Sequence, residues 1–496
     1  MKRTVILLVI ILLLVADFAL PNEKTPTKVR KSAIAGSWYP ADKAELQKML
    51  SSLFSRVPKV NFYGEVRALI VPHAGYQYSG PAAAIAYATI RGEDIRRVII
   101  MGPTHYTYFH GVSIPKVKAY ETPLGEVPLD WEKARKLLKH KPFTTYPEAH
   151  KREHSVEIQL PLLQTILAGK KFTIIPMVFG ELSEKDYDKV AKAIVPLIDE
   201  HTLIVASSDF VHYGRRFNYT PFTKEIKKNL QKLNYGAIER IVNFDFTGFL
   251  KYKKDTGATI CGFRPIATLL KILDKNYYAE VLSYYTSGEI TGNYTDCVSY
   301  TSICFTPRRE KLLPQEKETL LKLARDTLRS YLTEKKSPNV TLDRYDITPK
   351  LLEKSGVFVT LKKKGKLRGC IGYIQGVLPI YQAVIANTIN AATRDPRFPP
   401  MKPSEIDKVE IEISVLTPLK KISDISEIEV GKHGLYLVKG ANAGLLLPQV
   451  ATEFGWNRRQ FLEAVSEKAG LEKDAWKRGA EIYIFEAQVF SEKKKH

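Results

Sequence analysis

Histidine residues follow two apolar stretches of this sequence, at the points where predicted strands end. His73 lies in Pro72-His73-Ala74-Gly75, directly after the run 66–71, and His105 lies in Gly102-Pro103-Thr104-His105, after the run 98–101. In open α/β sheets, the carboxyl ends of the strands form the edge where ligands and catalytic groups collect. We therefore expect both imidazoles at one functional edge.

Two later stretches of the sequence also end in side chains that could do chemistry. Asp209 and His212 follow the run 202–207, and Cys261 lies in Ile260-Cys261-Gly262, just before a predicted helix. A helix N-terminus lowers the pKa of a thiol and favours the thiolate. Two imidazoles and a thiolate suit an iron, copper or zinc ion, while a nearby Asp and His can orient ligands or move protons. Taken singly, each histidine is also compatible with a hydrogen-bonded core residue.

A competing motif is His150-Lys151-Arg152-Glu153-His154, which fits the H-x-x-E-H spacing of inverted zinc peptidases. That chemistry needs both histidines on one face in the middle of a helix. Here Pro147 precedes the motif and Pro161 follows it, which places the motif at a helix start. We therefore interpret the spacing as a chance match and keep a zinc peptidase as a minor hypothesis.

The elements that must position these residues alternate between strands and helices. Apolar runs without alternation predict strands buried on both faces, at 66–71, 98–101, 172–178 and 202–207. Helical patterns lie between them, at 81–90, 131–138, 154–167 and 185–198. This order predicts a mostly parallel sheet with helices on both faces, an α/β domain.

A second domain begins after a proline and a charge run at 307–311. Helices are expected at 314–333, 380–393 and 459–469, and strands at 356–362, 409–415 and 481–489. This mixed order, with clean alternation at 409–415, predicts a smaller α+β domain. We therefore divide the chain into an N-terminal segment 1–21, a linker 22–30, an α/β domain 31–306, a linker 307–313 and an α+β domain 314–490.

Charge and cysteine content limit the classes of partner. The chain has 496 residues, with 75 basic and 53 acidic side chains and a formal charge of +22. One interpretation of this positive charge is that the protein binds a polyanion or an anionic membrane. The basic residues are dispersed, however, and no recognition module stands out, so we favour a solvated basic surface and expect no specific nucleic-acid binding. Four cysteines exclude a disulfide scaffold.

The N-terminus resembles an export signal. Lys2 and Arg3 precede an apolar run at 5–16 that is shorter than a full membrane span. Cleavage and retention as an uncleaved anchor both remain open, so we expect export or membrane association through residues 1–21, and otherwise a cytoplasmic protein. In an oxidising compartment, Cys297 and Cys304 could pair.

The α+β domain carries its own candidate site. Leu367-Arg368-Gly369-Cys370-Ile371-Gly372 places a guanidinium beside a thiol, in an expected turn made permissive by two glycines. Arg394 and Arg397 follow in a rigid, proline-bounded loop. Such a cluster could lower the pKa of Cys370 or bind an anion. The alternative is a tight turn around a small buried residue. The candidate residues are Arg368, Gly369, Cys370, Arg394 and Arg397.

Five ordered motifs make the first domain resemble the Memo family, also called AmmeMemoRadiSam system protein B. They are Pro72-His73-Ala74-Gly75-Tyr76, Gly102-Pro103-Thr104-His105, Glu153-His154-Ser155-Val156-Glu157, Ser207-Ser208-Asp209-Phe210-Val211-His212 and Ile260-Cys261-Gly262. Ala35-Gly36-Ser37-Trp38-Tyr39-Pro40 is similar to the family's N-terminal motif. The resemblance covers about residues 30–306.

The Memo resemblance implies a fold similar to that of class III extradiol dioxygenases, and an iron or copper ion held by His73, His105 and Cys261, with zinc as a further option. His154, Asp209 and His212 match other pocket residues and are the expected catalytic groups. A thiolate in place of the usual carboxylate favours copper or a redox role. The implied function is a non-haem iron or copper oxidoreductase. The alternative is a non-catalytic module that carries metal or binds a peptide or protein.

The second domain resembles the Amme family, AmmeMemoRadiSam system protein A, over about residues 312–490. The resemblance rests on the Leu367–Gly372 hexapeptide, the Arg394–Pro400 loop, Glu453-Phe454-Gly455-Trp456 and Lys468-Ala469-Gly470-Leu471. It implies a shared pathway with a radical-SAM protein, and fusion fixes the two domains at equal stoichiometry.

Overall fold

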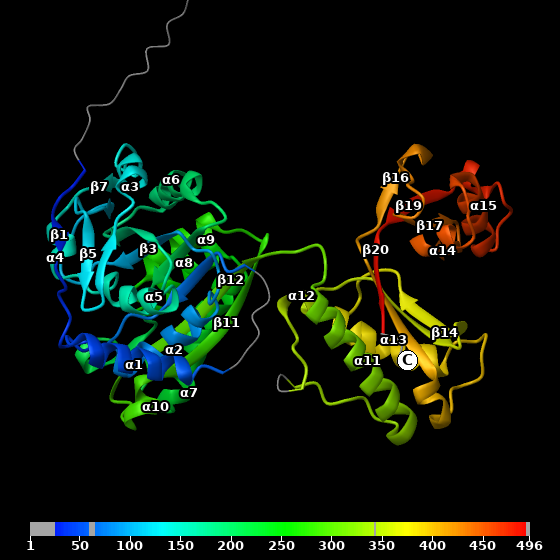
Figure 1. Cartoon of the computed structure of the whole chain (residues 1–496), viewed down its shortest axis with the longest axis horizontal. Coiled ribbons are helices and arrows are strands. Elements are labelled where there is room, and N and C mark those ends of the chain that lie inside the picture. The colour runs from blue at the N-terminus through cyan, green and yellow to red at the C-terminus, as the bar shows by residue number, and fades with distance from the viewer. Residues whose placement is uncertain (1–24, 59–64, 342–343, 493–496) are drawn as a thin grey trace, which may run out of the picture. The chain divides into compact units, whose positions relative to one another are not determined.

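The computed structural model describes residues 25–58, 65–341 and 344–492. The expected export signal or anchor at 1–21 lies outside these ranges. Within them, none of the helices is long and apolar enough to cross a membrane. The described chain forms two compact units, with residues 25–58, 65–275 and 279–306 in the first and residues 276–278 and 307–492 in the second (Figure 1).

The first unit is built on a mixed sheet with the strand order β10-β12-β2-β9-β3-β8-β4-β7, in which β11 also pairs with β12. Its centre is parallel and consists of β2 (Ala68–Val71), β9 (Thr202–Ser207), β3 (Arg97–Pro103) and β8 (Thr173–Phe179). Every residue of β2 and β9 is buried, as their unbroken apolar runs predict. The remaining strands are β4 (Val112–Ser113), β7 (Phe143–Thr144), β10 (His212–Gly214), β11 (Tyr277–Thr286) and β12 (Asp296–Pro307).

Two groups of helices cover this sheet (Figure 1). The first group contains α1 (Lys43–Ser55), α2 (Tyr76–Ala88) and α5 (Leu160–Ile166), and α2 packs on β2. The second contains α6 (Glu184–Ile194), α8 (Phe246–Thr256) and α9 (Phe263–Ile272), and α9 packs on β3 and β9. Further elements of the unit are β1 (Val29–Arg30), β5 (Ala119–Thr122), β6 (Gly125–Pro128), α3 (Trp131–Leu137), α4 (Glu148–Lys151), α7 (Ile226–Val242) and α10 (Ser287–Thr291). The predicted α/β class is confirmed.

Two predicted helix starts were wrong. Helix α2 begins at Tyr76 rather than at Pro81, which lies inside the helix. Helix α5 begins at Leu160, because the predicted helical stretch from 154 is a loop followed by a short 3-10 turn at Glu157–Gln159. Residues 154–159 therefore do not follow the residue spacing of an α-helix, and their side chains can point toward the sheet edge.

The second unit contains two four-stranded sheets and has the predicted α+β organisation. The first sheet has the order β14-β13-β15-β20, with β13 (Val357–Lys363), β14 (Lys366–Tyr373), β15 (Val409–Leu416) and β20 (Ala487–Ser491). Helices α11 (Pro314–Glu334) and α13 (Ile380–Thr393) share its apolar core, and α12 (Pro349–Leu352) packs against α13.

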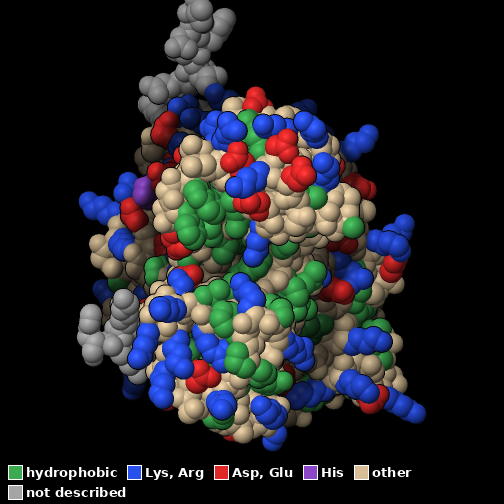
Figure 2. All heavy atoms as spheres, turned by 90° about the vertical axis from the view of Figure 1, so that its right-hand side faces the viewer, with side chains coloured by type: hydrophobic (Ala, Val, Ile, Leu, Met, Phe, Trp, Pro, Cys, Tyr) green, Lys and Arg blue, Asp and Glu red, His purple; other side chains and the backbone are tan. Residues whose placement is uncertain are grey.

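The other sheet has the order β16-β19-β17-β18, with β16 (Lys420–Ile422), β17 (Gly434–Lys439), β18 (Asn442–Leu446) and β19 (Glu481–Phe485). It packs with α14 (Pro448–Glu453) and α15 (Arg458–Lys468) around a separate core. The strand expected at 481–489 is two strands, because the chain leaves one sheet after Phe485 and enters the other at Ala487. Figure 2 shows lysine and arginine side chains spread over the visible face, with acidic side chains between them.

Candidate metal site

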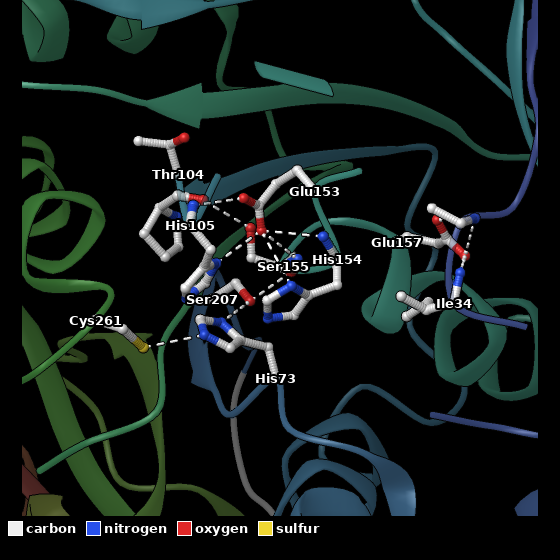
Figure 3. A network of polar contacts seen from close by, with 12 residues as sticks. Ile34, His73, Thr104, His105, Glu153, His154, Ser155, Glu157, Ser207 and Cys261 are labelled. Atoms are coloured by element: carbon white, nitrogen blue, oxygen red, sulfur yellow. Dashed lines mark hydrogen bonds and ion pairs between the residues drawn. The ribbon is translucent and has the colours of Figure 1, made fainter. Parts of the chain in front are cut away.

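Three histidines from separate loops meet at the carboxyl edge of the parallel strands (Figure 3). Ring nitrogens of His73, His105 and His154 all lie within 4.8 Å of one another. A second group, in which the ligand atoms are equally close, combines His73 with Asp209 and Cys261. His73 belongs to both groups, so it is the centre of the candidate site.

Hydrogen bonds fix the ring tautomer of His73, which is only 1% exposed. Its Nδ1 lies 2.9 Å from the hydroxyl oxygen of Ser207, and that hydroxyl donates its own proton to the carbonyl oxygen of Ser155 at 2.6 Å. The Ser207 oxygen can therefore only accept from His73, so Nδ1 carries the proton. This leaves a lone pair on Nε2, which lies 3.0 Å from the sulfur of Cys261.

His105 is oriented by a buried carboxylate. Its backbone N–H and its ring Nδ1 donate to Glu153 at 2.7 and 2.9 Å, and the Glu153 side chain is 2% exposed. Burial alone would raise the pKa of Glu153, but the hydrogen bond from His105 and the nearby imidazoles lower it to about 2. The carboxylate is ionised, so it holds the proton of His105 on Nδ1 and leaves Nε2 free to act as a ligand.

His154 supplies the third imidazole. Its ring stacks on that of His105 at 4.3 Å and lies 4.2 Å from the ring of Trp38. Among the described residues, its buried Nδ1 has no hydrogen-bond partner, and it lies 3.6 Å from Glu153. Burial and the neighbouring imidazole of His105 lower the pKa of His154 to about 3, so it is neutral at physiological pH. A neutral, buried and unpartnered ring nitrogen fits a role as a metal ligand.

Asp209 and Cys261 form the second group with His73. A carboxylate oxygen of Asp209 accepts the backbone N–H of His73 at 2.7 Å, and burial raises the pKa of this carboxyl. The prediction of a lowered pKa for Cys261 was wrong: burial and the neighbouring Asp209 carboxylate raise it well above its ordinary value. The thiol precedes Gly262, the N-cap of α9, and desolvation outweighs the helix dipole there. A bound cation would instead lower the pKa of this thiol and favour the thiolate.

His212 lies on β10 with its Nδ1 facing the carbonyl oxygens of Phe210 and Thr259, at 3.0 and 3.2 Å. It therefore donates from Nδ1 and keeps a free Nε2. Its backbone N–H donates to the hydroxyl of Thr259, two residues before Cys261, at 2.9 Å. The structure thus brings five of the six expected residues into the two groups around His73 and places His212 next to the segment that carries Cys261. The set of imidazole, thiol and carboxylate donors fits iron, copper or zinc, and the role of each residue stays a prediction.

The H-x-x-E-H motif does not form a peptidase site. His150 lies on the four-residue helix α4, and His154 lies in the loop that follows. Both ring nitrogens of His150 are engaged, with Tyr120 at 3.2 Å and Ser113 at 2.9 Å. Among the described residues, neither group of possible ligand atoms combines His150 with His154, and Glu153 binds His105 instead.

Acidification should destabilise the folded protein through His150. Burial, reinforced by the charge of Arg30, lowers its pKa to about 3, whereas an unfolded chain has a histidine pKa near 6.5. Between these values the unfolded chain binds the extra proton, so the free energy of unfolding falls by about 1.4 kcal/mol for each pH unit of acidification. Urea unfolding at two pH values should show this loss in the wild type and a smaller loss in His150→Asn. Equal losses would contradict the assignment.

Glu157, which has no predicted role, organises the segment that contacts the site through Trp38. Its carboxylate is fully buried and accepts hydrogen bonds from the Arg30 guanidinium at 2.5 Å, the Ser32 hydroxyl at 2.5 Å, the Tyr39 hydroxyl at 2.8 Å and the backbone N–H groups of Ala33 and Ile34 at 2.9 and 3.2 Å. These bonds, among them the one between Glu157 and Ile34 in Figure 3, hold residues 30–39 in place. The Trp38 ring of this segment lies 4.2 Å from that of His154. The only sequence signal was the position of Glu157 in an unexplained motif.

The hexapeptide of the second unit forms strand β14, so the prediction of a turn was wrong. Its glycines serve close packing rather than a turn. A Cβ atom on Gly369 would lie 2.1 Å from the carbonyl oxygen of Ala391 in α13, and one on Gly372 would lie 2.3 Å from the ring of Phe358. The strand can therefore approach its neighbours only with glycine at these positions.

The arginines of this region are largely neutralised by acids. Cys370 donates its N–H to Asp395 at 2.8 Å and accepts from Arg397 at 3.1 Å through its carbonyl oxygen, while Arg397 also pairs with Asp395. Burial raises the pKa of Cys370, which argues against a lowered pKa, one of the two functional interpretations of this cluster. Arg368 pairs with Glu405 at 3.0 Å, and Arg394 contacts Asn390 of its own helix at 3.3 Å. An anion site here stays a prediction.

The α/β sheet with its edge cluster defines a protein with a candidate transition-metal site, followed by a separate α+β unit. The model of the Memo-like protein family matches residues 30–304, and the chain belongs to this family. The AMMECR1 family model matches residues 321–490, so the second unit is an AMMECR1 domain.

Relatives of each part occur as separate proteins. A MEMO1 family protein of Thermoplasma volcanium is 34% identical over 278 residues, which are 55% of this chain and 97% of that protein. A Methanopyrus kandleri protein is 47% identical over 193 residues, 37% of this chain and 91% of its own length. The crystal structure of an uncharacterized protein from Pyrococcus horikoshii is 39% identical, covering 37% of this chain and 94% of its own, with a TM-score of 0.35.

Proposed function

We propose that the Memo-like unit binds iron or copper and carries out redox or oxygen-linked chemistry. The observation that carries this proposal is the fixed tautomer of His73 and His105. Both rings donate from Nδ1 to buried acceptors, which leaves the Nε2 lone pair of each ring available as a ligand atom. The Nε2 of His73 lies 3.0 Å from the sulfur of Cys261, a second candidate ligand. Orientation of an imidazole through its Nδ1 proton is typical of metal-binding histidines.

The residues divide into those that hold the metal and those that move protons. His73, His105 and Cys261 would hold the ion, and His154 would either complete the ligand set or contact substrate. Asp209, whose pKa burial raises, is suited to accept and release a proton at its carboxylate. His212 can exchange a proton at its free Nε2. The bound ion would supply the redox chemistry, and the thiolate favours copper or electron transfer over dioxygenase chemistry.

Anaerobic metal titration with absorption spectroscopy tests this proposal. Cu(II) or Fe(III) bound by Cys261 should give an intense thiolate-to-metal charge-transfer band at one ion per chain. The Cys261→Ala variant should lose this band. His201→Ala changes a half-buried histidine just before β9, at the opposite end of this strand from Asp209, and should retain the band. An unchanged band in Cys261→Ala, or no stoichiometric binding of either metal, would overturn the assignment.

Tryptophan emission gives a second, local measurement. Because the Trp38 ring lies 4.2 Å from that of His154, a bound Cu(II) ion should quench its fluorescence at short range. We expect Trp38→Phe to remove most of the copper-dependent quenching. The buried Trp131, which lies on α3, is the matched control, and Trp131→Phe should leave the quenching in place. Equal quenching in both variants would place the copper elsewhere.

A non-catalytic metal carrier or protein-binding module is the second candidate. Tyr106 and Tyr108, which follow His105, are 47% and 76% exposed, and exposed aromatic rings suit contact with a peptide or protein, including a radical-SAM protein of the same system. Pull-down experiments with the wild type and a His73→Ala/His105→Ala variant separate the two candidates. Partner binding that survives metal loss supports the module, and binding that needs the metal supports the enzyme.

A further inference from the structure

A large cavity lies at the end of the sheet opposite the histidines. Its volume is about 1050 Å³, and its lining includes Arg96, which immediately precedes β3, and Thr173, which begins β8. His105 follows the other end of β3. A seven-residue strand spans about 23 Å, so the cavity and the candidate metal site are separate. A cavity of this size accommodates a small organic ligand.

The charges of the cavity favour an anion. Its lining contains one acidic side chain, Glu126, against five basic ones, Lys43, Arg91, Arg96, Lys170 and Lys171. Arg96 pairs with Asp94 at 2.6 Å, and Glu126 pairs with Lys118 at 3.2 Å. Within the described ranges, Lys43 and Lys171 have no acidic partner. Unpaired cations in a concave site concentrate anions there.

The cavity also has an apolar part. One wall is a stripe along α1, formed by Lys43, Gln47, Ser51 and Phe54. Their spacing of three and four places these side chains on one helical face, with the lysine at one end and the aromatic ring at the other. Arg91 lies over the Phe54 ring at 5.9 Å, and Ile166 and Leu167 contribute further apolar surface. The cavity thus combines cationic and apolar surface.

We propose that this cavity binds an organic anion with a phosphate or carboxylate head and an apolar body. The head contacts the lining lysines that have no acidic partner, Lys43 or Lys171, and the body lies along Phe54 and Ile166. The site is independent of the proposed metal chemistry, so a His73→Ala variant binds the same anion. Inorganic phosphate, which lacks the body, binds more weakly, and octanol, which lacks the charge, does not compete.

Titration calorimetry of the full chain with octyl phosphate and with octanoate tests the proposal and distinguishes the two head groups. The variant Lys43→Glu/Lys171→Glu should weaken binding about tenfold or more, because two attractions become repulsions. The double variant Lys224→Glu/Lys232→Glu makes the same change in net charge on and near α7, away from the cavity, and should bind like the wild type.

A single, conservative substitution controls for the case in which the double lysine variant fails to fold. Gln47→Glu adds one negative charge to an exposed position of α1, where glutamate favours the helix, and should also weaken binding. The proposal is overturned if neither octyl phosphate nor octanoate binds at millimolar concentration. It is equally overturned if Lys43→Glu/Lys171→Glu and Gln47→Glu bind as tightly as the Lys224→Glu/Lys232→Glu control.

Discussion

Replacing His73 with alanine should abolish stoichiometric metal binding and weaken affinity by about 100-fold or more. His73 belongs both to the group with His105 and His154 and to the group with Asp209 and Cys261, so its loss removes a ligand from either arrangement. Ser207 and Gln159, whose side chains lie next to the ring, are hydrogen-bonded to each other and offer no imidazole in its place. Anaerobic dialysis against iron or copper, followed by elemental analysis of the protein, measures the effect.

Variants of the outer ligands show which group the metal uses. If His73, His105 and His154 hold the ion, His154→Gln should weaken metal binding more than Cys261→Ser does. If His73, Asp209 and Cys261 hold it, Cys261→Ser should weaken metal binding more than His154→Gln does. His201→Ala, which removes a half-buried imidazole paired with Asp94, is the control and should bind like the wild type. Wild-type metal content in His73→Ala would show that the edge cluster is not the metal site.

The location of the site was predictable because of how parallel strands are buried. The runs that became β2, β3 and β9 are continuously apolar, so their ends were visible in the sequence, and the residues just beyond them had to share one edge. This is why His73, His105 and Asp209 were predicted together.

The groups that control the site were not predictable, because their partners are distant in sequence. The carboxylate that orients His105 comes from Glu153, 48 residues later, and Arg30 reaches Glu157 across 127 residues. The pKa of Cys261 was misjudged for the same reason. The neighbouring helix was visible in the sequence, but burial and the adjacent Asp209, 52 residues earlier, depend on the folded structure.

The prediction of a turn in the second unit was wrong because it rested on two glycines. Two glycines in the Leu367–Gly372 hexapeptide resemble a turn, but a glycine in a strand also permits close backbone approach. Gly369 has this second role because α13 packs directly against β14. Only the packing partner distinguishes the two roles, and the sequence of one strand does not contain it.

Replacing Glu157 with glutamine should have the largest effect on stability, lowering the free energy of unfolding by about 3–5 kcal/mol. The substitution leaves Arg30, whose side chain is 7% exposed, as a buried charge without an acidic partner. It also weakens the hydrogen bonds that hold residues 30–39. Urea unfolding in a Trp456→Phe/Trp476→Phe background measures this, because Trp38 and Trp131 then report on the first unit alone.

The matched control is Glu121→Gln, which breaks the ion pair of Glu121 with Lys31 in the same segment. The side chain of Lys31 is 75% exposed, so this loss should cost less than about 1 kcal/mol. Glu157→Gln should also reduce the copper-dependent quenching of Trp38, because residues 30–39 no longer hold that ring against His154. Equal destabilisation by the two substitutions would contradict the role of Glu157. A stability loss with unchanged quenching would show that Glu157 supports the fold without positioning Trp38.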